Sequence, residues 1–420
     1  MKKKQKAEPE RHPKGKAVNK SRNNSGGGLT FSEKKRLIQL KHILSGKSNE
    51  KEKPTTAQKT ITFEKMFRDG ICQVSHRYYT KMVEFFDINY SLLEVDEQAD
   101  ILAQYSKLIN YFDPSVKFEL VLFNRQVNEQ MLTEQFDIPW QEDDFNDIRE
   151  EYTEMLKKQA AKGNNGIIKS KYLIFGVESN GYKEAKSRLN NIEKDVIRNL
   201  NNIGTLARGL DGKERLRILH EYFNQDTMEP FRFSFKDLAE SGKSVKDYIA
   251  PPGFDFRYPN RFKSGNMYGC VSYLDIIAPK FTDELIKHLL DIDANLTISM
   301  HMQTEDPVKA IKKLKAVISN IQKMKIEEQK KAVRSGYDMD IIPSDLATFG
   351  GEAKRLLQDL QTRNERLFLV TILIMNTATN RQKLENAVFQ TAAIAQKYNC
   401  ALKRLDFQQE EGLMSSLPIG

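Results

Sequence analysis

Residues 365–407 read ERLFLVTILIMNTATNRQKLENAVFQTAAIAQKYNCALKRLDF. The apolar run 367–375 is far too short to cross a bilayer, and residues 367–374 are expected to form a central strand buried on both faces. Apolar residues then recur at helical spacing over 381–398, where Thr379 and Gln382 fit a capping box. A strand pattern returns at 400–408. The order strand, helix, strand predicts a βαβ unit.

The same order occurs once before in this half of the chain. Residues 267–277 have the pattern of a strand, 282–290 that of a helix, and 294–303 alternate between apolar and polar. Asp306 and Pro307 then predict the start of a long helix, which Gly336 ends. Two such units predict an α+β fold with mixed sheets of repeated ferredoxin-like βαβ units and with helices on one face.

The first half of the chain also alternates strands with helices. Strands are expected at 60–67, 70–86, 116–127 and 170–179, and helices at 95–112, 145–161 and 182–204. Pro and Gly are frequent in residues 250–266, which predicts a linker. The chain is therefore expected to hold one α+β domain at 60–249 and a second at 267–420.

The positive charge is concentrated at the N-terminus. Residues 1–59 hold 17 Lys or Arg and 5 Asp or Glu, whereas the remainder holds 49 basic and 52 acidic residues. Such a composition predicts a disordered basic arm. Within it, Ser32 is placed to cap a short amphipathic helix. The arm is either a solubilising tail or an element that contacts anionic lipid, a partner protein or nucleic acid.

The sequence contains no clear catalytic, cofactor-binding or metal-binding motif. The cysteines Cys72, Cys270 and Cys400 are far apart, which favours free thiols. His301 has no ligand-type partner in its own segment and is interpreted as a surface or rim histidine. Carboxylates in 143–154 scatter around a helix instead of converging. His76, His220 and His288 are equally solitary. The LDID sequence at 290–293 resembles the D-x-D of metal-dependent sugar transferases, but it is expected in a helix-to-strand turn, where Asp side chains bond the local backbone.

The tetrapeptide SGKS occurs twice and is the second half of a phosphate-binding loop. The full motif needs a glycine five residues before its second glycine, and Lys41 and Asp237 stand at these positions. Lys47 and Lys243 are therefore interpreted as loop residues, and no nucleotide site is predicted in this chain.

A resemblance covers the layout of residues 60–420 and is specific from about residue 246. The segments KDYIAPPGFDF at 246–256, residues 265–315 and residues 350–420, which end in LMSSLPIG, resemble the N-terminal region of VirB/TrbE/CagE-type transfer ATPases. These proteins drive type IV secretion and conjugation. Characteristic marks are 249–252, Asp306–Pro307, 352–360 and 365–368. The Lys-rich arm resembles versions from Gram-positive mobile elements.

The resemblance implies the non-motor part of such an ATPase. In that family the RecA-like motor, which uses ATP and Mg²⁺, begins after the segment equivalent to 417–420. This chain would then dock the motor to channel subunits at the inner face of the membrane, as a cytoplasmic, peripheral and oligomeric protein. Two alternatives are a standalone scaffold or adaptor and a nucleic-acid-binding protein, although the near-neutral body argues against the latter.

Overall fold

The computed structural model describes residues 56–88, 90–126, 145–163, 167–225, 231–277, 282–335, 344–362 and 365–420. Residues 1–55 of the predicted arm, with its helix at Ser32 and the first SGKS, lie outside these ranges, as does Gly336. The last residues of the predicted arm, 56–59, are described and belong to a short helix and its cap. The described residues form one compact unit. In the described ranges, no helix has the length and apolar character of a membrane span.

The chain builds the same topology twice. In the first repeat the chain order is β1 (Lys65–Met66), β2 (Cys72–Ser75), β3 (Tyr78–Phe85), α3 (Val95–Tyr111), β4 (Val116–Gln126), β5 (Ile167–Glu178), α6 (Tyr182–Ile203), β6 (Ala207–Gly209) and α7 (Gly212–Phe223). In the second repeat it is β7 (Phe254–Asp255), β8 (Phe262–Ser264), β9 (Met267–Ile276), α9 (Asp283–Leu290), β10 (Asn295–Thr304), β11 (Phe368–Ala378), α12 (Arg381–Lys397), β12 (Cys400–Arg404) and α13 (Gln409–Ser415).

Further elements lie before, between and within the repeats. They are α2 (Ala57–Thr60), the 3-10 turns η1 (Tyr90–Leu92) and η2 (Val245–Tyr248), α5 (Asn146–Gly163), α8 (Phe235–Ser241), α10 (Pro307–Arg334) and α11 (Ser344–Thr362). Helix α5 lies between β4 and β5, whereas α10 and α11 lie between β10 and β11. Both repeats therefore carry a helical insert at the same point of the topology.

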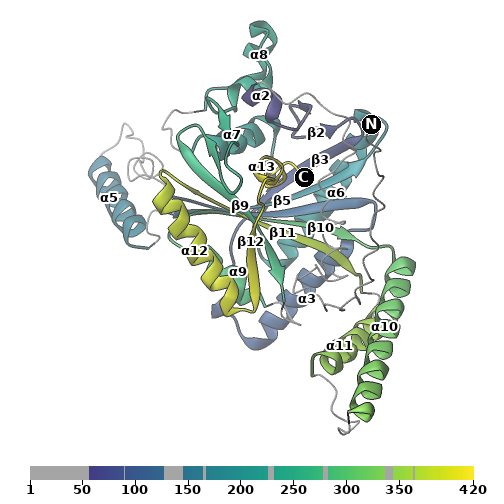
Figure 1. The fold of residues 1–420 in the computed structure, drawn as a ribbon. Coiled ribbons are helices and arrows are strands. Elements are labelled where there is room, and N and C mark those ends of the chain that lie inside the picture. Colours follow the sequence, from purple (N-terminus) through teal and green to yellow (C-terminus); the bar gives the residue numbers. More distant parts are fainter. Residues whose placement is uncertain are drawn as a thin grey trace, which may run out of the picture. The chain divides into compact units, whose positions relative to one another are not determined.

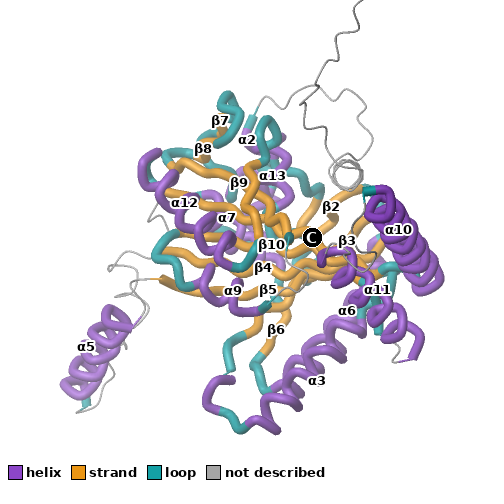
Figure 2. Tube along the Cα trace, turned by 60° about the horizontal axis from the view of Figure 1, so that its bottom comes forward, coloured by secondary structure: helices purple, strands orange, loops and turns teal. Residues whose placement is uncertain are grey.

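Each repeat has a ferredoxin-like strand order. The first runs β6-β3-β5-β4 and the second β10-β11-β9-β12, and the pairing of β4 with β10 joins them into one 12-stranded sheet. Figure 2 shows β10, β4 and β5 in succession in the middle of this sheet. Because β4 and β10 are antiparallel, the two inserts leave the sheet at opposite ends. In Figure 1 the pair α10 and α11 projects from the sheet.

Four helices of the two repeats, α3, α6, α9 and α12, pack on one face of the sheet, here called the helical face. Beneath α3 and α6 lie Phe118, Phe175 and Val177, and beneath α9 and α12 lie Ile298 and Ile374. Alternation along β4 turns Glu119, Val121 and Phe123 to the second face. That face is covered by α7 and α13, whose Leu216, Tyr222, Leu413 and Met414 join its core.

The helix boundaries follow from local sequence. Asp306 caps α10 by accepting a bond from the Lys309 amide, and Pro307 occupies its first turn. Gly204 ends α6 at φ 93°, in the left-handed conformation that glycine adopts without strain. The expected capping box of Thr379 and Gln382 is wrong: α12 is capped by Asn380, which accepts from the Lys383 amide.

The α+β class and the βαβ units agree with expectation. Helices on one face only were expected, but α7 and α13 cover the second face. The expected mixed pairing is also not found. Every strand pair is antiparallel. Each of the helices α3, α6, α9 and α12 connects two strands that run in the same direction, but a third, antiparallel strand lies between those two in the sheet. The sheet also continues across the predicted boundary at 250–266, where β7 and β8 pair and the adjacent Ile249 is fully buried. The two predicted domain ranges thus correspond to two repeats that share one sheet.

Strand β11 is central, between β10 and β9, as expected. Its residues Ile372 to Thr377 are buried, but Leu369 and Val370 are 38% and 51% exposed. The expectation of burial on both faces is therefore correct only for the second part of the strand.

Candidate functional site

A six-residue segment, Ser415–Gly420, lies against the middle of the second face and is here called the anchored segment. It begins with the last residue of α13. Its side chains Leu417 and Ile419 are 1% and 3% exposed and join the core that α7 and α13 form over the sheet. Burial of two aliphatic side chains contributes about 1.5–3 kcal/mol each. The segment is therefore a part of the core and not a surface tail.

Four side chains bind carbonyl groups of the anchored segment. Tyr222 Oη and Ser299 Oγ both donate to the Ser416 carbonyl, at 2.7 and 3.1 Å. His301 Nε2 lies 2.7 Å from the Ser415 carbonyl, and Thr80 Oγ1 donates to that of Ile419 at 2.6 Å. These side chains come from α7, β10 and β3, so both repeats hold the segment. Backbone groups that lose water on burial are satisfied in this way.

Glu119 binds the end of the anchored segment. Its Oε2 accepts from the Gly420 amide at 3.0 Å. Gly420 has φ 94°, and a Cβ at this position would lie 2.7 Å from Thr80 Cγ2. Residue 420 therefore has to be glycine for two reasons: the backbone is in the left-handed region, and there is no room for a Cβ beside Thr80.

The electrostatics of the site follow from its burial. Glu119 is 1% exposed, and desolvation raises its pKa well above the ordinary value, although the Gly420 amide and the Arg215 charge oppose this. Burial lowers the pKa of His301, although its bond to the Ser415 carbonyl opposes the shift. The two side chains are 3.7 Å apart, Oε1 to Nε2. Since burial disfavours charge on both, we interpret them as a neutral pair in which His301 Nε2–H donates to Ser415.

Arg215 is the largest fully buried side chain among the described residues. Its guanidinium donates to the Gly70 carbonyl at 2.9 Å and to the Thr80 carbonyl at 3.1 Å, and it also contacts Thr80 Oγ1. Within the described ranges, Arg215 Nε and Glu119 Oε1 have no hydrogen-bond partner. Arg215 thus fixes the strand that supplies Thr80 and places a positive charge beneath the anchored segment.

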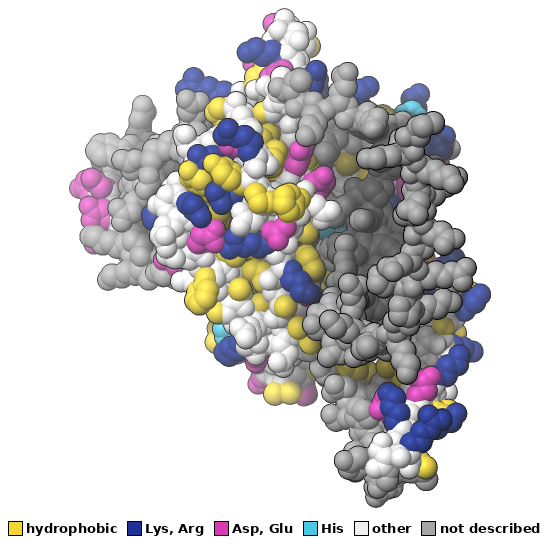
Figure 3. Space-filling model, in the orientation of Figure 1, with side chains coloured by type: hydrophobic (Ala, Val, Ile, Leu, Met, Phe, Trp, Pro, Cys, Tyr) yellow, Lys and Arg dark blue, Asp and Glu magenta, His cyan; other side chains and the backbone are white. Residues whose placement is uncertain are grey.

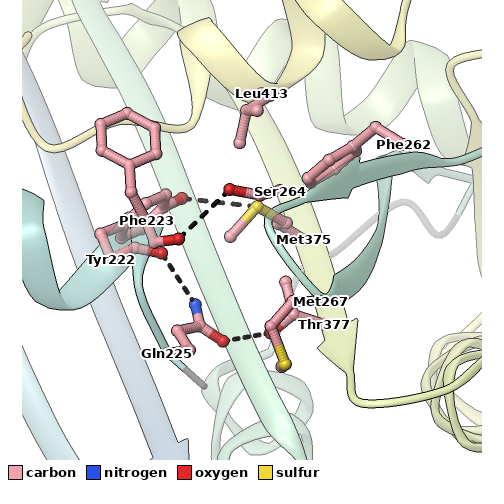
Figure 4. Close-up of a pocket in the computed structure, with 9 residues that line it drawn as sticks. All are labelled: Tyr222, Phe223, Gln225, Phe262, Ser264, Met267, Met375, Thr377 and Leu413. Carbon is pink, nitrogen blue, oxygen red and sulfur yellow. Dashed lines mark hydrogen bonds between the residues drawn. The ribbon is translucent and has the colours of Figure 1, made fainter. Parts of the chain in front are cut away.

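A small cavity lies beside the site, between α7, β8, β9, β11 and α13 (Figure 4). Its volume is about 10 Å³, which is room for one water molecule. Ser264 Oγ donates to the Phe223 carbonyl, and Thr377 Oγ1 donates to Gln225 Oε1 at its wall (Figure 4). No substrate fits in this space. The arrangement is suited to holding a peptide segment.

Of the histidines that the structure describes, only His301 belongs to this site. From the sequence, His301 was interpreted as a surface or rim histidine because its own segment offers no partner. In the structure its partner is Glu119, which comes from the other repeat. His288 is not solitary, since its Nδ1 lies 2.6 Å from Tyr398 Oη. His76 is exposed, and His220 packs on Phe231.

The second SGKS joins two short helices. Gly242 is the left-handed C-cap of α8 at φ 65°, and Ser244 begins η2 in a capping box with Asp247. Lys243 Nζ lies over the Tyr248 ring, 5.8 Å from its centre. Gly242, Lys243 and Ser244 thus all take part in local structure.

The carboxylates of the LDID turn contact residues of the first repeat and not the local backbone. Asp291 pairs with Lys169, and Asp293 accepts from Gln126 in the LDID turn. The acidic stretch 143–154 lies in or next to α5, with 143 and 144 outside the described residues. Where the structure describes the chain, no three His, Cys, Asp or Glu side chains gather as metal ligands would.

The anchored segment and its partners were not predicted from the sequence. One signal was present: Glu119 is the single acidic residue within the run FELVLF, where an alternating buried strand leaves no solvent for it. When the chain is compared with models of protein families and with curated proteins, no family model and no curated protein matches.

Proposed function

We propose that this chain is the non-motor N-terminal part of a type IV secretion or conjugation ATPase. In this role it docks an ATP-driven motor to channel subunits at the inner face of the cell membrane during DNA or protein transfer. The proposal rests on the resemblance of residues 246–420 to that family, including the ending LMSSLPIG. ATP and Mg²⁺ belong to the motor and not to residues 1–420.

The structural observation that supports this function is the anchored segment. In the family, the motor follows the position equivalent to Gly420. Here that position is held by Thr80 and Glu119 of the first repeat, and the residues before it by Ser299 and His301 of the second. A motor joined there would be tied to both repeats by buried bonds instead of a loose linker. Movement of the motor would then be transmitted to the sheet.

The alternative from the sequence, a standalone scaffold, uses the same surfaces without a motor. The two functions differ in what the reading frame encodes after Gly420. The proposed function requires a G-x-x-x-x-G-K-[ST] motif there.

The test compares residues 1–420 with the chain extended through that motif. We expect no ATP hydrolysis from residues 1–420 and magnesium-dependent hydrolysis from the extended chain. Ala at the lysine of the downstream motif should abolish hydrolysis, whereas Lys243→Ala, the matched control in the second SGKS, should leave it unchanged.

Two results would contradict the proposal. One is a reading frame that continues into no such motif, which would favour a scaffold. The other is saturable ATP binding by residues 1–420 that is lost in Lys243→Ala.

A further inference from the structure

Helix α10 is strongly basic, although residues 60–420 as a whole are nearly neutral. Its 28 residues include nine Lys or Arg and two Glu, a net charge of +7. Residues 60–420 as a whole hold 49 basic and 52 acidic residues. Helix α10 is therefore strongly basic within a body that is nearly neutral overall, and Figure 3 shows Lys and Arg side chains over it.

Most of this charge lies on one side of the helix. At about 100° per residue, seven of the nine basic side chains fall within an arc of about 100°. These seven, here called the basic stripe, are Lys309, Lys312, Lys313, Lys323, Lys330, Lys331 and Arg334. The stripe extends over about 37 Å, and the helix contains no Gly or Pro after Pro307 that would kink it.

The stripe faces solvent. Buried or half-buried residues of α10, such as Ala310, Leu314 and Ile321, lie on the opposite side. Within the described part of the chain, only two members of the stripe form ion pairs, Lys313 with Glu305 and Lys331 with Glu328. The other five charges are left for an external anion.

The equivalent insert of the first repeat provides an internal comparison. Helix α5 holds four basic and four acidic residues and is neutral. The fold does not require a basic helix at this point of the topology. The charge on α10 is thus a property of this insert and not of the architecture.

The shape of the stripe distinguishes between two anionic partners. A straight row of charges on one side of a rod can contact a flat surface along its whole length, whereas a DNA duplex crossed by the same rod curves away from most of it. Aliphatic side chains flank the stripe, with Val317 and Met324 on one side and Ile326 and Val333 on the other, each about half exposed. The helix has no aromatic residue on which a base could stack.

We propose that the basic stripe of α10 binds the anionic surface of a lipid bilayer. The lysines and Arg334 contact phosphate headgroups, and the flanking aliphatic side chains enter the interface between headgroups and acyl chains. This inference rests on the charge and shape of α10 and does not depend on the proposed motor.

The test uses the full chain and two matched variants, each with four exposed lysines replaced by Gln. The stripe variant changes Lys309, Lys312, Lys323 and Lys330. The control variant changes Lys107, Lys183, Lys194 and Lys236, which lie on other helices. Gln retains high helix propensity, so both variants should fold, and circular dichroism and thermal melting check this.

Binding is measured by co-sedimentation with vesicles of equal parts phosphatidylcholine and phosphatidylglycerol, and with phosphatidylcholine alone. We expect the stripe variant to lose at least about tenfold in partitioning to the anionic vesicles, and the control less than about twofold. Residues 1–59 are present in all three proteins, so their charge cannot produce this difference.

The proposal is overturned if the stripe variant binds like the control. A larger loss of binding to a DNA duplex than to vesicles would instead assign the stripe to nucleic acid. Equal binding of the unaltered protein to neutral and anionic vesicles would also contradict the proposal.

Discussion

Glu119 of the first repeat and His301 of the second lie directly opposite each other on β4 and β10, the two strands that join the repeats. Their side chains turn to the same face, where both reach the anchored segment. The junction of the two repeats is therefore also the place where residues 415–420 are held.

Glu119→Gln should stabilise the protein at neutral pH. Burial raises the pKa of Glu119 above its ordinary value of 4.5, so above that pH the folded state holds a proton that the unfolded state loses. The Glu119 contribution to stability therefore falls as pH rises towards its folded pKa. The amide oxygen of the substituted side chain can still accept from the Gly420 amide, and the amide does not titrate.

The measurement is urea unfolding of both proteins between about pH 5 and about pH 8. The difference in unfolding free energy should grow in favour of the variant as pH rises. A difference of opposite sign would mean that Glu119 is stabilised as a carboxylate by Arg215.

Tyr222→Phe and Ser299→Ala should cost more together than the sum of their separate effects. Both hydroxyls donate to the Ser416 carbonyl, so each single variant leaves it one partner and should cost about 1 kcal/mol or less. The double variant leaves a buried carbonyl without a donor, which should cost a further ~1–2 kcal/mol. A double-mutant cycle from urea unfolding checks this, and simple additivity would show that water replaces the hydroxyls.

Gly420→Ala should release the anchored segment. The positive φ and the approach to Thr80 predict a loss of about 1–3 kcal/mol. Gly253→Ala is the matched control, because no atom lies within 4 Å of the added Cβ and its φ is not in the left-handed region. Thermal unfolding of both variants measures the difference, and equal melting temperatures would contradict the anchoring of Gly420.

Two charges placed in β11 should have opposite outcomes. Ile372→Asp buries an unpaired carboxylate at a side chain only 4% exposed and should abolish soluble folding, at a cost of several kcal/mol. Leu369→Asp lies where 38% of the side chain is exposed and should leave a soluble, folded protein. Soluble expression and circular dichroism distinguish them, and loss of folding in both would place Leu369 in a buried environment.

Local sequence patterns were sufficient to predict most helices and strands but not how these elements assemble into one sheet. The apolar periodicity of α6 and the Asp306–Pro307 start of α10 are local signals, and both elements occur where expected. The capping residue of α12 was missed because Thr379 and Asn380 are both good caps, and the choice depends on backbone geometry. The duplication was missed because the repeats share topology and not a visible sequence pattern.

The anchored segment and the residues that bind it could not be predicted from the sequence for a related reason. Glu119, His301 and Gly420 are far apart in the sequence, and only strand register brings the first two together. Register over such separations depends on the whole sheet and not on neighbouring residues. An acidic residue inside an apolar strand indicates a buried partner but does not identify it.

The anchored segment also affects how the protein is made. Gly420 is 301 residues later in the chain than Glu119, which it binds. At 5–20 residues per second, a ribosome needs about 15–60 s to add these residues. During that interval the second face of the first repeat exposes Thr80, Glu119 and the apolar residues that Leu417 and Ile419 later cover. A nascent chain whose residues 415–420 have not yet left the ribosome is therefore expected to bind chaperones more strongly than one in which this segment has emerged.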